Sequence, residues 1–68
     1  MGRPLNFVVI IEATETTIDD FRRRAAMAAR DDDEAWRWEW LAGGQAEFGF
    51  ETEDQAAIFG MLNKLRKR

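Results

Sequence analysis

The chain has 68 residues and a net charge of −3, from thirteen acidic and ten basic side chains, and it contains no cysteine, histidine, serine or tyrosine. Those missing types are the usual general bases, nucleophiles and soft metal ligands, so the composition argues against an enzyme and excludes disulfides and cysteine- or histidine-bound zinc. We expect a single domain over residues 1–68, because so short a chain has no room for a second core. We also expect no cofactor and no small-molecule substrate.

The first predicted element is a strand over Leu5–Thr14, which includes the most apolar run of the chain. Its side chains are mostly β-branched or aromatic, and both of its faces are apolar. One face carries Phe7, Val9 and Ile11, and the other carries Val8 and Ile10. The run is far too short to span a bilayer and Glu12 follows it, so we expect a cytoplasmic protein with no membrane association and no signal peptide.

A helix is predicted from Thr16 or Thr17 to about Arg30. Asp19 and Asp20 fall in its first turn, where carboxylates stabilise the positive end of the helix dipole. Apolar side chains at spacings of three and four form its core face, which consists of Ile18, Phe21, Ala25, Ala28 and Ala29. Because most of these side chains are alanine, the helix can lie close to a sheet.

Charged residues are clustered along the chain. Basic residues gather in this helix and at the C-terminal end, as Arg22, Arg23, Arg24, Lys64, Arg66, Lys67 and Arg68. Acidic residues gather after the helix in an acidic patch of Asp31, Asp32, Asp33 and Glu34. The patch has three interpretations: a solvated loop, a docking site for a basic partner, or a loose divalent-ion site without the pattern of a calcium loop. Inside the helix, a spacing of four residues predicts that Asp19 pairs with Arg23 and Asp20 with Arg24.

A hairpin is predicted from Ala35–Leu41 and Gln45–Glu51 around two glycines. Large aromatic side chains alternate with other residues along both strands, so the loop length decides which residues share a face. We predict a loop of three or five residues. The expected cross-strand pairs are Trp40 with Phe48, Trp38 with Phe50 and Arg37 with Glu51. The shared aromatic face, interpreted as core rather than as a stacking platform for bases, consists of Trp36, Trp38, Trp40, Phe48 and Phe50.

A second helix is predicted from a capping box at Thr52–Gln55 to about Lys67. Its expected core stripe is Ile58, Met61, Leu62 and Leu65. The element order is then β-α-β-β-α, an α+β two-layer sandwich in which both helices cover one face of a three-stranded sheet. This arrangement resembles a ferredoxin-like fold that lacks its last strand, which would leave the first strand at an edge of the sheet.

The segment Ala46–Ala57 is similar to the third strand and second helix of RNA-recognition motifs, in which an aromatic strand leads through an acidic turn into a helix. That resemblance implies exposed aromatic residues that stack on bases. The chain departs from the pattern because it has no predicted fourth strand, and because the predicted register turns Phe48 and Phe50 inward. Residues 45–47 also lack the basic residue that precedes the aromatic strand, so no RNA-binding residues are carried over. In size, acidity and missing chemistry the chain also resembles small phage or mobile-element accessory proteins, including anti-CRISPR inhibitors.

Three hypotheses for function follow. The first is a non-enzymatic protein-interaction module, an inhibitor or adaptor, which binds a protein partner or a second copy through its first strand and open sheet face. Its contact residues would be Val8, Ile10, Arg37, Glu39, Glu47 and Glu51. The alternative is a nucleic-acid-binding domain that uses the basic clusters described above, although the acidic net charge disfavours it. The third is a purely structural subunit, which the sequence does not distinguish from the first.

Overall fold

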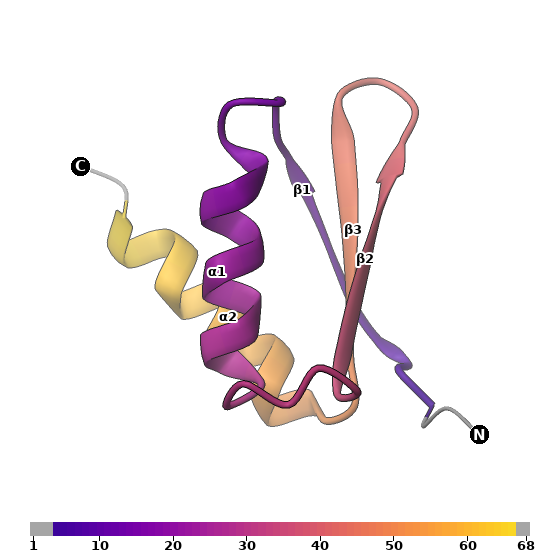
Figure 1. The fold of residues 1–68 in the computed structure, drawn as a ribbon, viewed down its shortest axis with the longest axis vertical. Helices are drawn as coiled ribbons and strands as arrows, with labels where there is room; N and C mark the ends of the chain where they lie inside the picture. The colour runs from indigo at the N-terminus through magenta and orange to yellow at the C-terminus, as the bar shows by residue number, and fades with distance from the viewer. Residues whose placement is uncertain (1–3, 67–68) are drawn as a thin grey trace.

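A computed structural model describes residues 4–66, with side chains described through Lys64. The described elements are β1 (Phe7–Glu12), α1 (Ile18–Ala28), β2 (Trp36–Leu41), β3 (Gln45–Phe50) and α2 (Glu53–Arg66). The strands form one antiparallel sheet in the order β1-β3-β2, and both helices lie on one side of it (Figure 1). The predicted α+β class and element order are confirmed. Within residues 4–66, neither helix is both long and apolar enough to cross a membrane.

The hairpin between β2 and β3 has a three-residue loop, in which Gly43 and Gly44 adopt positive φ angles of 79° and 77°. This conformation is readily available only to glycine. The prediction of an odd-numbered loop is confirmed, so the five aromatic side chains share the helix-facing side. The individual pairs are shifted by two residues from the prediction, because the predicted pairs belong to a five-residue loop. The observed pairs are Trp36 with Phe50, Trp38 with Phe48, Trp40 with Ala46 and Arg37 with Gly49.

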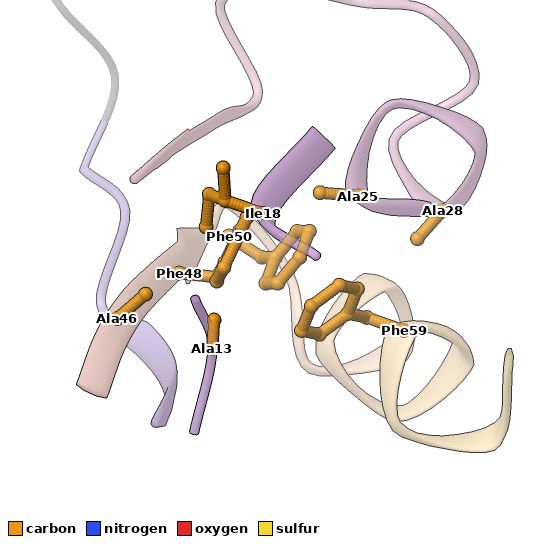
Figure 2. Close-up of a cluster of buried hydrophobic side chains, with 8 residues drawn as sticks. All are labelled: Ala13, Ile18, Ala25, Ala28, Ala46, Phe48, Phe50 and Phe59. Carbon is orange, nitrogen blue, oxygen red and sulfur yellow. The ribbon is translucent and has the colours of Figure 1, made fainter. Parts of the chain in front are cut away.

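The core lies between the central strand β3 and the two helices. Phe48 and Phe50 of β3 are fully buried, and Phe59 of α2 packs against both, with ring centroids 4.8 Å and 5.2 Å away (Figure 2). Trp36 and Trp38 stack on Phe48 from β2 and are half-buried. The expectation that the tryptophans form core is therefore met only in part, since Trp40, near the loop end of β2, is 44% exposed.

The predicted core stripe of α2 is wrong at Ile58 and Met61. Phe59, which the prediction left out, is fully buried, whereas Ile58 is 39% and Met61 61% exposed. Leu62 is half-buried, and the side chain of Leu65 lies outside the described residues. The physical reason is that the Phe59 ring has the largest apolar area on α2, and its burial against Phe48 and Phe50 sets how the helix is rotated.

Helix α1 buries the predicted face. Ile18, Ala25 and Ala28 are buried, Ala29 just beyond the helix is buried as well, and Phe21 packs against the core. The predicted spacing of its ion pairs differs from the structure. Arg22 contacts Asp19 at 3.3 Å and Arg23 contacts Asp20 at 3.6 Å, each three residues apart rather than four.

The end of α1 is a left-handed turn without glycine. Arg30 and Asp31 have φ angles of 57° and 61°. The N–H of Asp31 donates to the carbonyl of Ala26 at 2.8 Å, and the N–H of Arg30 donates to that of Met27 at 3.0 Å. This bonding is typical of helix C-termini, where the left-handed residue is usually glycine because a side chain at positive φ is strained.

Replacing Arg30 by glycine is therefore expected to stabilise the fold by about 0.5–1 kcal/mol, since relief of the strain exceeds the added entropy of the unfolded chain. Urea unfolding followed by circular dichroism measures the change. The matched control is Arg23→Gly within α1, which should destabilise the protein by about 1 kcal/mol. If both substitutions destabilised the protein equally, the inference that the backbone of Arg30 is strained would be wrong.

Helix α2 begins with the predicted capping box. The N–H of Gln55 donates to the Thr52 hydroxyl oxygen at 3.2 Å, and the Gln55 side-chain oxygen accepts from the N–H of Thr52 at 3.1 Å. The same Gln55 oxygen also accepts from the N–H of Glu51 at 3.1 Å. These bonds fix the turn that carries the chain from β3 into α2.

Candidate docking surface

The sheet has an open face, which is the side away from the helices. The strand register arranges this face in three rows that run from β1 across β3 to β2. The rows are Val8–Gly49–Arg37, Ile10–Glu47–Glu39 and Glu12–Gln45–Leu41. Five of the six predicted contact residues therefore lie in two adjacent rows. The third row, which the prediction did not include, could have been found from the same period-two alternation.

Along β1 the open face carries an apolar strip, Val8 and Ile10, which are 44% and 53% exposed. Within residues 4–66, β1 pairs only with β3, so its other side is a free edge of the described sheet. The N–H of Ala13 donates to the carbonyl of Gly44 at 3.0 Å, which continues the β1–β3 ladder. Because ladder bonds alternate along an antiparallel strand, the backbone groups of Val8, Ile10 and Glu12 point outward at this edge.

Acidic side chains dominate the rest of the open face. Glu39 lies directly opposite Glu47, an arrangement of like charges that disfavours strand pairing. The Arg37 guanidinium lies 3.8 Å from the Glu47 carboxylate and offsets part of this repulsion. The predicted pairing of Arg37 with Glu51 is wrong, because Arg37 sits opposite Gly49. Glu51 lies beyond the end of β3, half-buried, and its backbone N–H donates to the carbonyl of Ala35.

The chain segment before β1 covers one end of the open face. An added Cβ at Gly49 would lie 3.1 Å from the carbonyl oxygen of Leu5 and 3.7 Å from Cγ of Arg37. Gly49 is consequently buried although it lies on the side without helices. The side chains of Val8, Ile10, Arg37 and Glu39 remain exposed on the open face, and Glu47 is half-buried.

A second apolar region, missed by the sequence prediction, lies on the helix side of the β1 edge. Phe7 is 42% exposed on the helix-facing side of β1, and Ile58 and Met61 are exposed on α2. Helix α2 packs on β1 and β3, and α1 packs on β2. The Asn63 side chain accepts a hydrogen bond from Arg24 of α1 at 3.1 Å and marks the side of α2 that faces α1. Ile58 and Met61 lie roughly opposite Asn63 around the helix, and so face away from α1.

The acidic patch forms the exposed connection between α1 and β2. The Asp32 side chain accepts a hydrogen bond from the N–H of Glu34 at 3.1 Å, and its carbonyl accepts from the N–H of Ala35 at 2.9 Å. Asp32 thus shapes the turn that leads into β2, while Asp31, Asp33 and Glu34 are exposed. The part of the chain that the structure describes contains no group of three or more side chains placed to hold a metal ion.

The three arginines of the basic cluster in α1 each have a partner within the protein. Arg22 and Arg23 form the ion pairs described above, and Arg22 also lies over the Trp38 ring at 5.5 Å. Arg24 bonds to Asn63 and lies 4.9 Å from the Phe21 ring. These contacts draw the guanidinium groups toward neighbouring side chains. Of the C-terminal cluster, Lys64 is exposed, and the side chains of Arg66, Lys67 and Arg68 lie outside the described residues.

A shallow depression of about 560 Å³ lies between the hairpin loop and the turn after β1. Its lining residues are Glu12, Ala13, Thr14, Thr17, Phe21, Gly43 and Gly44. The threonine groups in it bond to one another, with the N–H of Thr14 donating to the Thr17 hydroxyl at 2.8 Å. Across the described residues, no polar or charged side chain is buried. The depression thus lacks the enclosed, converging polar groups that usually define a small-molecule site.

In the resemblance to RNA-recognition motifs, aromatic side chains of the third strand stack on bases. In this structure the corresponding side chains point away from the open face. Phe48 and Phe50 are fully buried beneath the helices, so neither ring can stack on a base. No protein family, curated protein or solved structure matches the chain.

Proposed function

We propose that this protein is a small non-enzymatic interaction module, of the inhibitor or adaptor kind, that docks through the β1 edge and the open face. The observation that carries the proposal is the position of the apolar strip beside outward-pointing backbone groups. An exposed apolar edge strand favours association unless something covers it, and strand addition is a common mode of protein recognition. Such a module acts by occupying a surface of its partner.

Charge supports the choice of a protein partner over nucleic acid. Among the residues described on the open face, Glu12, Glu39 and Glu47 stand against one arginine, Arg37, so phosphate groups would be repelled there. A partner surface with apolar and basic side chains would complement the apolar strip and the carboxylates beside it.

The test is affinity capture from a cell lysate with mass-spectrometric identification, comparing the wild-type chain with a Val8→Lys/Ile10→Lys double variant. We expect the double variant to lose the captured partner, with affinity about a hundredfold or more weaker, because buried like charges at an interface cost several kcal/mol. The variant should keep its fold, because both positions are about half exposed. Circular dichroism checks this point.

The matched control is Met27→Lys/Ala42→Lys, which adds the same two positive charges at exposed positions away from the open face and from the β1 edge. It should capture the partner as the wild-type chain does. A partner held equally by both double variants would contradict the proposal, and so would a wild-type chain that binds neither another protein nor itself. A captured nucleic acid whose binding weakens steeply with salt would favour the basic clusters instead.

A further inference from the structure

We infer that the occupant of the β1 edge is a second copy of this chain, joined by antiparallel pairing of β1 with β1 of the copy across a two-fold axis. This inference rests on the proposed docking function and names the partner at that surface. The two sheets would become one continuous six-stranded sheet with all four helices on the same side.

The first argument is that the strand is complementary to itself in one register. With Val9 opposite Val9 of the second copy, Val8 lies opposite Ile10 and Phe7 lies opposite Ile11. Every residue over 7–11 then faces an apolar residue. A shift of two residues in one direction places Ile10 opposite Asn6, and a shift in the other direction places Val8 opposite Glu12. A two-fold interface requires this kind of self-complementarity.

The backbone agrees with this register. The outward groups of β1 belong to Val8, Ile10 and Glu12, as the bond between Ala13 and Gly44 shows. Pairing Val8 with Ile10 of the copy joins two residues whose N–H and C=O groups both point outward, so each pair forms two ladder bonds. Val9 then occupies the non-bonded position on the two-fold axis, where opposing strands approach most closely.

Apolar side chains would gain apolar neighbours on both sides of the new strand pair. On the open face the two apolar strips would meet, and on the other side the exposed Phe7 would gain an apolar neighbour. The exposed Ile58 and Met61 of α2, which face away from α1, lie on the helix side of the sheet at this same edge.

The other edge of the sheet is a poorer site for this pairing. β2 carries Arg37 and Glu39 between its tryptophans, and charged side chains on an edge strand discourage strand addition. β1 has no charged side chain before Glu12 at its end. A second copy is therefore expected at β1 and not at β2.

The chain contains no cysteine, so single-cysteine variants report the register directly. We expect air oxidation to link Val9→Cys to its copy at least about tenfold faster than Glu39→Cys on β2, because only the Val9 pair would lie within disulfide reach. Val8→Cys and Ile10→Cys should link as slowly as Glu39→Cys. In the proposed register residue 8 lies opposite residue 10 of the copy, so neither introduced cysteine faces its own counterpart. A faster disulfide at Val8 or Ile10 than at Val9 would overturn the register.

Light scattering after size exclusion tests association without any cysteine. The wild-type chain and Met27→Lys/Ala42→Lys should have twice the mass of one chain at micromolar concentration. Val8→Lys/Ile10→Lys should have the mass of one chain, because its introduced ammonium groups would face those of the copy. If the wild-type chain stays monomeric up to millimolar concentration, a second copy does not occupy the β1 edge. A dimer that persists in Val8→Lys/Ile10→Lys would overturn the inference as well. The capture experiment tests the docking function independently of the dimer. A monomeric chain could still capture a different protein in a way that depends on Val8 and Ile10.

Discussion

Replacing Phe59 by alanine is expected to lower the free energy of unfolding by about 3–5 kcal/mol, which is comparable to the whole stability of a domain of this size. The ring is fully buried and packs on both phenylalanines of β3. Its loss removes the contact that joins α2 to the sheet and leaves a cavity that the short chain has few side chains to fill. Urea unfolding followed by circular dichroism should show a largely unfolded protein even without denaturant.

The matched control is the neighbouring residue. Ile58→Ala removes a large apolar side chain from the same helix turn, but this side chain is 39% exposed and should cost about 1 kcal/mol or less. The comparison separates two rotations of α2, since the sequence-predicted stripe places Ile58 in the core and leaves Phe59 out. If Ile58→Ala were the more damaging substitution, the described position of α2 would be wrong.

Replacing Ala25 by leucine is expected to destabilise the protein by about 3 kcal/mol, the upper part of the range for overpacked cores. Ala25 is fully buried where α1 faces the core, and Figure 2 shows it directed toward the cluster around Phe50 and Phe59. Three additional carbon atoms at this point would push α1 away from the aromatic rings. Thermal unfolding should show a lower melting temperature and a weaker near-ultraviolet signal from the tryptophans.

Ala57→Leu serves as the control, because Ala57 is exposed on α2 and both alanine and leucine favour helix. Its stability should stay within about 0.5 kcal/mol of the wild-type value. A similar loss of stability at both positions would mean that leucine is harmful for a reason other than packing beneath α1.

Periodicity predicted α1 and failed on α2, and the difference has a physical cause. The apolar residues of α1 form one narrow face, so only one rotation buries Ile18 together with Ala25 and Ala28. Helix α2 has apolar residues on several sides, including Ile58, Phe59 and Met61. Its rotation is set by contact with Phe48 and Phe50, which lie far away in the sequence.

The face assignment of the hairpin depended on the parity of the loop, which the alternation of aromatic residues determines. The exact cross-strand partners depended on the loop length, and two glycines are compatible with more than one length. Arg37 was for this reason assigned to Glu51 when its ion-pair partner is Glu47. A shift of two residues preserves every face and changes every pair.

The candidate docking surface was predictable only in its apolar part. Val8 and Ile10 are conspicuous in the sequence because they alternate with Val9 and Ile11 in a run without charge. The helix side of the same edge could not be predicted, because Ile58 and Met61 look like core residues in any helical pattern. Their exposure follows from the rotation of α2 and from the absence of a further described strand beside β1.

The pairing of β1 with β3 also has a consequence for protein synthesis. During translation β1 leaves the ribosome first, yet its partner strand in the finished fold follows only after α1 and β2, with Phe7 opposite Phe50. Such long-range pairing slows folding and leaves an apolar strand open to other nascent chains. Slow elongation through the hairpin would therefore favour aggregation, whatever the stability of the completed protein.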